Sequence, residues 1–345
     1  MAPRAFITGL AGLSITGPER SFLRDAEPWG LIIFKRNVST PDQVTELTQT
    51  FRDCIGWEAP VFVDQEGGRV QRLGPPHWPA YPAGQRYGEI YDRDPSAGVA
   101  AARLAGHLIA ADLRALGIDA DCLPLADVPL ASSDPVIGDR AYGRETVKVS
   151  AIAKAIAEGL QAGGVLPVLK HLPGHGRATA DSHHDLPVVD ADRATLEATD
   201  FAAFRPLAGL PIGMTAHVVF TAFDPVAPAT TSATIVRQVI RGFIGFQGLL
   251  MSDDISMNAL SGTIVERSRA ALTAGCDVVL HCNGVMSEME AVAAEAPKLA
   301  GETAIRAQAA LARRSAPEEF DTQAARKIFT QMVSAEGTAP PRKTA

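Results

Sequence analysis

The chain has few cysteines and no long apolar run, and each absence removes a class of protein. Its 345 residues contain four cysteines, none of them in a C-x-x-C pair, which excludes a disulfide scaffold. No run approaches the roughly 20 apolar residues that a membrane-spanning helix needs. Three of the cysteines lie in or beside apolar runs, so we expect buried, reduced thiols and a cytoplasmic protein.

Basic residues and nucleotide-binding patterns are also scarce. Lys and Arg total 32 against 39 Asp and Glu, a formal net charge of −7. This balance argues against general affinity for nucleic acid, which needs a clustered basic surface. No G-x-G-x-x-G turn and no H-E-x-x-H pair occurs. The apolar start, AFITGLAGLSITG after Arg4, is broken by glycines, and we interpret it as a buried strand rather than a secretion signal.

What the chain does have is a regular alternation of short apolar runs and amphipathic stretches. Eight runs read as strands buried on both faces: 5–10, 30–34, 60–64, 117–128, 165–171, 211–218, 247–254 and 276–282. Helical patterns occupy 97–116, 145–163, 192–208, 232–242, 264–274 and 285–314. This alternation predicts a single-domain α/β protein, a (β/α)8 TIM barrel over residues 1–332 with a flexible tail at 333–345. A doubly wound sheet is the alternative.

Ionisable residues end most of the predicted strands. They are Asp64, Asp127, Lys170 with His171, His217, Asp253 with Asp254, and His281. Barrel enzymes carry their chemistry at the C-terminal ends of the strands, so we expect these groups to converge at one mouth of the barrel. A carboxylate at a strand end also commonly caps the next helix, which is the structural alternative for any one of them.

Four of the eight histidines fall in the loop KHLPGHGRATADSHHDLP, residues 170–187. One interpretation is a zinc site, although no helical ligand spacing is present. A second is acid–base chemistry, because Asp181 and His183 are two residues apart and the carboxylate can orient the imidazole and raise its basicity. A solvated loop with chance histidines is the third.

The seventh predicted strand ends in two adjacent aspartates, Asp253 and Asp254. Neighbours on an extended chain point in opposite directions, so only one can face the barrel axis. A buried, hydrogen-bonded aspartate there suits a nucleophile toward a sugar carbon. We expect the other to be structural.

Five motifs in order resemble glycoside hydrolase family 3. They are VDQEGGRVQR at 63–72, IGDRAYG at 137–143, KHLPGHG at 170–176, ADSHHDLP at 180–187 and MSDDISM at 251–257. More narrowly, the chain is similar to the single-domain bacterial β-N-acetylglucosaminidases of peptidoglycan recycling. The resemblance spans about residues 5–315 and implies a (β/α)8 barrel and a retaining mechanism.

The resemblance also implies roles for individual residues. Asp253 matches the nucleophile, His183 an acid/base histidine and Asp181 its partner. The residues that match contacts to the hydroxyls of N-acetylglucosamine are Asp64, Arg72, Arg140, Lys170 and His171. We expect Glu66 and His175 to support the loop rather than act on substrate.

The implied reaction removes terminal N-acetylglucosamine from muropeptides carrying 1,6-anhydro-N-acetylmuramic acid, without metal or other cofactor. We expect a monomer acting on a small carbohydrate. The alternatives are a phosphorylase or a β-glucosidase of the same family, a metal-dependent hydrolase that uses the histidine-rich loop, and an inactive carbohydrate-binding barrel.

Overall fold

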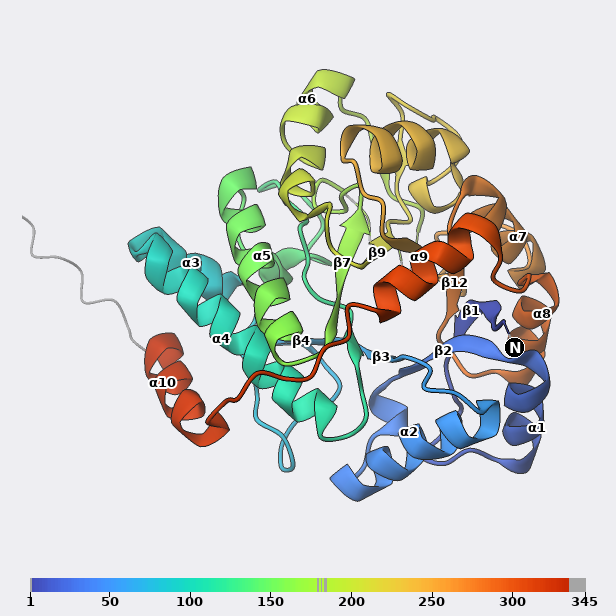
Figure 1. Cartoon of the computed structure of the whole chain (residues 1–345). Coiled ribbons are helices and arrows are strands. Elements are labelled where there is room, and N and C mark those ends of the chain that lie inside the picture. The colour runs from blue at the N-terminus through green and yellow to red at the C-terminus, as the bar shows by residue number, and fades with distance from the viewer. Residues whose placement is uncertain (1, 179, 181, 183–184, 335–345) are drawn as a thin grey trace, which may run out of the picture.

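Eight parallel strands close into a barrel in the computed structural model, which describes residues 2–178, 180, 182 and 185–334 (Figure 1). The strands are β1 (Arg4–Thr8), β2 (Pro28–Ile33), β3 (Val61–Val63), β6 (Ala120–Asp121), β7 (Leu166–Leu172), β9 (Ile212–Thr215), β11 (Leu249–Asp254) and β12 (Val278–His281). They pair in chain order, and β1 pairs with β12 to close the ring. The predicted TIM barrel is therefore confirmed.

Strand formation follows from burial on both faces. Every residue of β2 and β7 is buried, as is every residue of β1 after Arg4. Side chains that point inward fill the barrel, and those that point outward pack beneath the helices. Phe6, Phe62 and Met251 belong to one buried cluster, and Leu31, Val63 and Leu169 belong to another. The barrel is thus a packed core, open to ligand only at its ends.

Helices surround the strands (Figure 1). They are α1 (Gly17–Ala26), α2 (Pro41–Ile55), α3 (Gln85–Arg93), α4 (Pro95–Arg114), α5 (Thr146–Ala162), α6 (Arg193–Ala198), α7 (Ile264–Ala274), α8 (Met286–Glu295), α9 (Gly301–Leu311) and α10 (Thr322–Ser334). Short 3₁₀ turns occupy 35–37, 138–140, 201–203, 205–207 and 229–231, and a π-helix covers Ile235–Phe243. Thr40 caps α2 by accepting from the Gln43 N–H, with Pro41 in the first turn.

Two strand pairs lie outside the barrel. The antiparallel pair β4 (Gln65–Gly67) and β5 (Val70–Gln71) follows β3 directly, and the parallel pair β8 (Val188–Val189) and β10 (Val219–Phe220) joins two loops. The β4–β5 hairpin matters for function because it carries side chains over one mouth of the barrel.

Three predicted elements are wrong in extent. The fourth strand covers only Ala120–Asp121 of the predicted 117–128, because Pro124 has no N–H and the chain beyond it contacts β7 irregularly. The helix predicted at 285–314 splits into α8 and α9 around Pro297. The helix predicted at 192–208 stops at Ala198 and continues as two 3₁₀ turns.

Helix α10 was not predicted, and it contains the predicted domain boundary at residue 332. It packs on α4 and α3 (Figure 1). Tyr81 donates to Asp112 Oδ2 at 2.7 Å, and Arg326 of α10 donates to the Tyr81 hydroxyl at 3.2 Å. The division into a domain and a tail stays a prediction, since residues 335–345 lie outside the described part of the chain.

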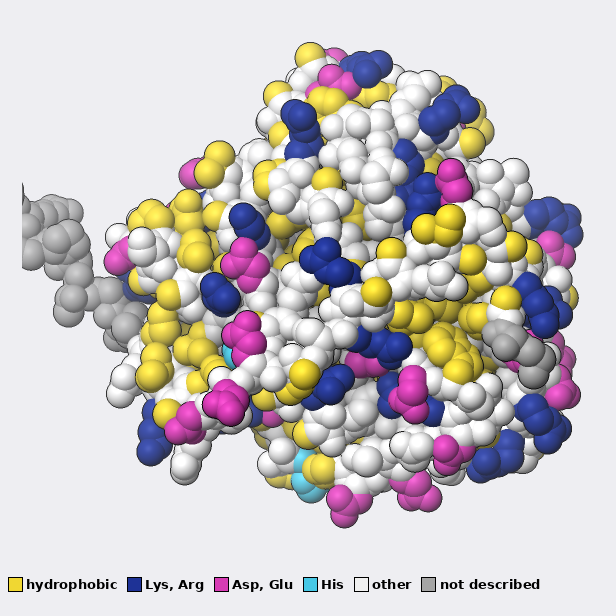
Figure 2. Space-filling model, viewed as in Figure 1, with side chains coloured by type: hydrophobic (Ala, Val, Ile, Leu, Met, Phe, Trp, Pro, Cys, Tyr) yellow, Lys and Arg dark blue, Asp and Glu magenta, His cyan; other side chains and the backbone are white. Residues whose placement is uncertain are grey.

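The face of the molecule seen in Figure 2 carries basic and acidic side chains intermingled, which fits the modest net charge. Within the described ranges, no helix has the length and apolar character needed to cross a bilayer.

Candidate active site

A pocket of about 540 Å³ opens at the C-terminal end of the barrel. The residues predicted to act there come from separate strand ends and loops. Those that line it are Asp64, Arg72, Arg140, Lys170, His171 and Asp253. All the predicted site residues that the structure describes therefore share one cavity, although they span nearly 190 positions of the sequence.

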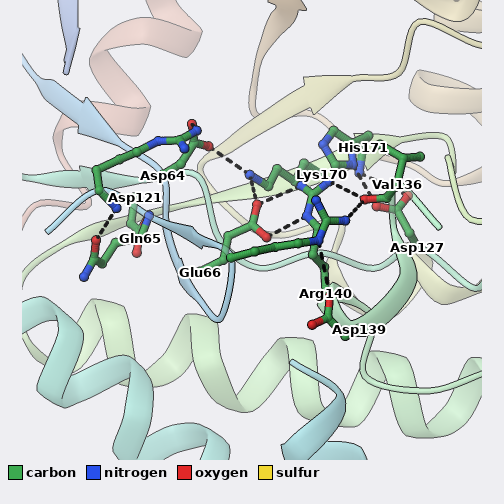
Figure 3. Close-up of polar contacts among 12 residues, drawn as sticks. Asp64, Gln65, Glu66, Asp121, Asp127, Val136, Asp139, Arg140, Lys170 and His171 are labelled. Atoms are coloured by element: carbon green, nitrogen blue, oxygen red, sulfur yellow. Dashed lines mark hydrogen bonds and ion pairs between the residues drawn. The ribbon is translucent and has the colours of Figure 1, made fainter. Parts of the chain in front are cut away.

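Lys170 occupies the centre of a buried ion-pair network (Figure 3). Lys170 lies near the C-terminal end of β7, and its ammonium is 3.1 Å from Asp64 Oδ1 and 2.6 Å from Glu66 Oε1. Arg72 Nη2 donates to the other Asp64 oxygen at 2.8 Å. The Lys170 side chain is only 2% exposed, so its position is set by these two carboxylates rather than by solvent.

Arg140 binds Glu66 through two parallel hydrogen bonds. Its Nε and Nη2 each donate at 2.8 Å, one to each carboxylate oxygen, the geometry that a guanidinium and a carboxylate favour. The sequence predicted that Asp64, Arg72 and Arg140 act together, with Glu66 supporting a loop. Glu66 lines the pocket and joins Arg140 to Lys170, and its role toward substrate stays a prediction.

The network keeps its members charged. Burial alone would raise the pKa of Asp64, but Lys170 and Arg72 hold it well below its usual range. Burial likewise opposes ionisation of Glu66, yet Arg140 and Lys170 lower the pKa of that carboxyl to about 2. Glu66 and Asp64 in turn outweigh the burial of Lys170 and raise its pKa. The cluster thus presents fixed charges to a polar ligand.

His171 follows Lys170 on β7 and is oriented by a buried aspartate. Its Nδ1 lies 2.7 Å from Asp127 Oδ2, and the Asp127 Oδ1 accepts the His175 N–H at 2.6 Å. Burial would raise the pKa of Asp127, but His171 and His175 lower it. Because the carboxylate accepts from Nδ1, the Nε2 atom of His171 is left for a ligand.

Asp253 and Asp254 have different surroundings at the end of β11. Asp253 Oδ1 accepts the N–H of Asp254 at 2.8 Å. Asp254 accepts the Ser256 N–H at 3.0 Å, the Ser256 hydroxyl at 2.6 Å and the Cys282 N–H at 3.2 Å. Asp254 therefore connects the loops after β11 and β12, whereas Asp253 has fewer partners among the described residues and lines the pocket.

Asp253 is ionised despite its burial. Burial would raise its pKa, but the rings of His217 and His171 and the Asp254 N–H lower it. His217 is held between the Thr230 hydroxyl at 2.7 Å and the Asp254 carbonyl at 3.0 Å. An ionised carboxylate at the pocket can act as a nucleophile.

The histidine-rich loop is described only in part. His175 lies in the pocket, with Nε2 3.1 Å from the Ser182 hydroxyl. Burial, together with the nearby His171, lowers the pKa of His175 to about 4. Asp181, His183 and His184 lie outside the described residues. Among the described residues, no group of three or more His, Cys, Asp or Glu side chains is arranged to hold a metal ion.

The pocket combines the charged network around Lys170 with the separate carboxylate of Asp253. Carboxylate, guanidinium and ammonium groups match the hydroxyls of a sugar, which donate and accept hydrogen bonds at fixed spacing. Glu66 is a charged pocket residue that the sequence analysis did not place among the substrate-binding residues. Its signal was its place in VDQEGG, two residues after a strand-end aspartate.

Known proteins share this architecture. Residues 11–313 match the glycosyl hydrolase family 3 N terminal domain. A beta-hexosaminidase of Bordetella avium is 39% identical over 287 residues, covering 82% of this chain and 81% of that protein. The beta-hexosaminidase of Bordetella pertussis is 35% identical over 347 residues, covering 97% of each.

A solved structure is similar over the same length. NagZ from Neisseria gonorrhoeae in complex with N-trifluoroacetyl-D-glucosamine superposes with a TM-score of 0.87 at 32% identity, covering 97% of this chain and 99% of that one. The family match, the barrel and the pocket agree with one another. The chain therefore belongs to glycosyl hydrolase family 3 and is a glycoside hydrolase.

Proposed function

We propose that this protein is a retaining exo-β-N-acetylglucosaminidase that acts on muropeptides. The observation that carries the proposal is the convergence of the Asp64–Arg72–Lys170 network and the Asp253 carboxylate on one pocket. The beta-hexosaminidase names of relatives and the N-acyl glucosamine in the NagZ complex support the choice of sugar.

The charged network would hold the non-reducing sugar. Asp64 and Glu66 would accept hydrogen bonds from hydroxyl groups, Arg72 would donate to another hydroxyl, and the His171 ring would donate or accept according to its tautomer. The two carboxylates already share Lys170 and the two guanidiniums, so the site is formed before substrate arrives. Preorganisation of this kind lowers the entropy cost of binding.

Asp253 would attack the anomeric carbon. In the first step a bond forms between Asp253 and C1, the bond from C1 to the leaving oxygen breaks, and His183 gives that oxygen a proton. In the second step water attacks C1, gives its proton to His183, and releases Asp253. Asp181 would orient His183. Two displacements at C1 retain the configuration of the sugar.

The setting of the reaction is part of the proposal. The four cysteines are unpaired, which fits a reducing compartment such as the cytoplasm. A monomer working on small fragments released from peptidoglycan needs no metal or organic cofactor in this scheme.

The test compares two chromogenic substrates and two products. An aryl N-acetyl-β-glucosaminide should be cleaved at least about 100-fold faster than the matching aryl β-glucoside, because a hydrogen-bonding site rejects an analogue that lacks its partner group. Proton NMR of the first product should show the β-anomer. A fragment carrying N-acetylglucosamine on 1,6-anhydro-N-acetylmuramic acid should also be cleaved.

Each part of the proposal has its own contradicting result. Preference for the glucoside would reject the sugar, and an α-anomer as the first product would reject the double displacement. Addition of phosphate should leave the product as free sugar. A sugar 1-phosphate in its place would make the protein a phosphorylase.

The role of His183 needs a separate series. His183→Ala should lose about 10²–10⁴-fold with a sugar leaving group and far less with an acidic phenol, which leaves without a proton. Azide should restore release of the sugar as a β-glycosyl azide, and Asp181→Ala should show a milder form. Equal losses on good and poor leaving groups, with no azide effect, would remove both residues from the mechanism.

A further inference from the structure

Asp121 is a buried carboxyl beneath the substrate-binding network that the proposed mechanism does not use. It lies on β6, between β3 and β7, and is 0% exposed. Its Oδ1 accepts the Gln65 N–H at 3.0 Å (Figure 3). Its Oδ2 is buried and has no hydrogen-bond partner in the described part of the chain.

Gln65 connects Asp121 to both halves of the β4–β5 hairpin. Its side-chain oxygen accepts the Arg72 N–H at 3.1 Å and the Leu73 N–H at 3.0 Å, and its Nε2 donates to the Leu73 carbonyl at 2.8 Å. The residue is 1% exposed. Asp121 thus holds the Gln65 backbone N–H, and the Gln65 side chain in turn holds the backbone N–H of Arg72.

Asp64 and Glu66 flank Gln65 directly in the sequence. The position of the Gln65 backbone therefore determines the Cα positions from which the Asp64 and Glu66 side chains extend into the pocket. A single hydrogen bond from β6 locates three of the five charged members of the network, namely Asp64, Glu66 and, through the Gln65 side chain, Arg72.

Charges act on Asp121 from β7 and from the segment that follows β3. Lys170 of β7 favours its ionisation, whereas Asp64 and Glu66 oppose it. The Cys122 thiol, next in the chain, is also buried, and burial raises its pKa well above the usual value. Burial raises the pKa of Asp121 to about 8, which favours the neutral carboxyl near pH 7.

We propose that Asp121 is a positioning residue, which acts through Gln65 to hold the sugar-binding network and which supports sugar binding in its neutral form. The inference rests on the proposed function, because it concerns the same site. Asp121 does not line the pocket, so it would not touch the sugar.

Ionisation of Asp121 should weaken the network for an electrostatic reason. The two pocket carboxylates, Asp64 and Glu66, are held in place by ion pairs with Lys170, Arg72 and Arg140. A third carboxylate would compete for Lys170 and repel Asp64 and Glu66. The repulsion would leave the positions of the two pocket carboxylates less fixed.

The experiment measures binding of N-acetylglucosamine by calorimetry from pH 6 to pH 9. This ligand is uncharged, so a change in affinity reports protein groups only. The variants are Asp121→Asn, which keeps the acceptor for the Gln65 N–H but cannot ionise, and Asp121→Ala, which removes it. The matched control is Asp119→Asn, two residues earlier, whose carboxylate accepts the Val61 N–H at 2.7 Å at the opposite end of the barrel.

We expect wild-type affinity to fall severalfold between pH 7 and pH 9, and the affinity of Asp121→Asn to stay constant over that range. Asp121→Ala should bind about fivefold more weakly at pH 7, the effect of one lost hydrogen bond. Asp119→Asn should follow the wild-type curve, because its partners lie away from the pocket.

Parallel pH curves for wild type and Asp121→Asn would overturn the inference. So would an Asp121→Ala protein that loses stability to urea without losing affinity, as a merely structural residue would. If Asp121→Ala does not fold, the Asn comparison alone decides. A wild type that neither binds N-acetylglucosamine nor cleaves its aryl glycoside would instead reject the proposed function, and the inference with it.

Discussion

The two ends of the barrel use the same kinds of residue for different purposes. At the N-terminal end, Asp277 accepts the Leu250 N–H at 2.9 Å and pairs with Arg241 at 2.8 Å and Arg306 at 3.1 Å. Asp119 has a similar set of partners, including Arg314 at 2.8 Å. These carboxylates have protein partners on both oxygens.

At the C-terminal end, the charged groups surround a cavity. Asp64, Glu66 and Lys170 are paired with one another, but they also line the pocket. Asp253 accepts the Asp254 N–H and also lines the pocket. We therefore expect ion pairs at the N-terminal end to stabilise the fold and those at the C-terminal end to bind ligand. Contact with the pocket is what distinguishes the second kind of ion pair from the first.

The largest expected difference between the ends concerns Asp253. Asp253→Ala should lower kcat by at least about 10³-fold, because the proposed mechanism assigns the covalent bond to this carboxylate. Its unfolding free energy should stay near that of the wild type, since the variant loses a single backbone hydrogen bond among the described residues. Steady-state rates and urea unfolding measure the two quantities. Full activity in this variant, with loss in Asp254→Ala, would exchange the two roles.

Asp277→Ala should show the reverse pattern. Removing this carboxylate takes the anionic partner from the largely buried Arg241 and the acceptor from the Leu250 N–H, which should cost about 3–5 kcal/mol of unfolding free energy. The kcat per folded molecule should be retained. Urea unfolding and active-site titration test this, and a variant that is as stable as the wild type but inactive would contradict the division between the ends.

Arg72→Ala should affect binding more than chemistry. The guanidinium contacts Asp64 at the edge of the pocket, and its loss should raise KM about tenfold, within the range for a charged hydrogen bond. The shape of the pH profile should be unchanged, because Arg72 transfers no proton. A shifted pH optimum would count against a binding role.

The smallest expected effect is on stability in alkali. The pKa of Asp121 is about 8 in the folded chain against 3.8 unfolded, so the folded state holds the proton more tightly. Its contribution to stability is complete below pH 3.8 and declines until about pH 8. From pH 7 to pH 9 the wild type should lose about 1 kcal/mol relative to Asp121→Asn. Equal losses in urea titrations at the two pH values would show that Asp121 does not titrate there.

Much of the barrel follows from the sequence because buried parallel strands are short, apolar and regularly spaced. The strand-end residues also follow, since the topology sends every strand end to the same mouth. The extent of the fourth strand did not, because Pro124 changes hydrogen bonding without changing the apolar pattern. Helix α10 was missed because its pairing with Tyr81 and α4 depends on residues more than 200 positions away.

Within the site, residue types were easier to predict than partners. Arg140 and Glu66 form a bidentate pair across 74 positions, and no local pattern indicates which carboxylate Arg140 selects. Asp121 was not singled out because it lies inside an apolar run, where its environment depends on Gln65 and Lys170. The roles of His183 and Asp181 stay predictions, since neither lies in the described part of the chain.

The pairing of β1 with β12 also has a consequence for synthesis. Phe6 is in register with Val279, so the first strand emerges from the ribosome long before its second neighbour exists. At about 5–20 residues per second, the delay is roughly 15–55 s. During that time one edge of β1 has no permanent partner and is open to pairing with other chains. A nascent chain of this protein should therefore depend on chaperone protection until residues 278–281 have been made.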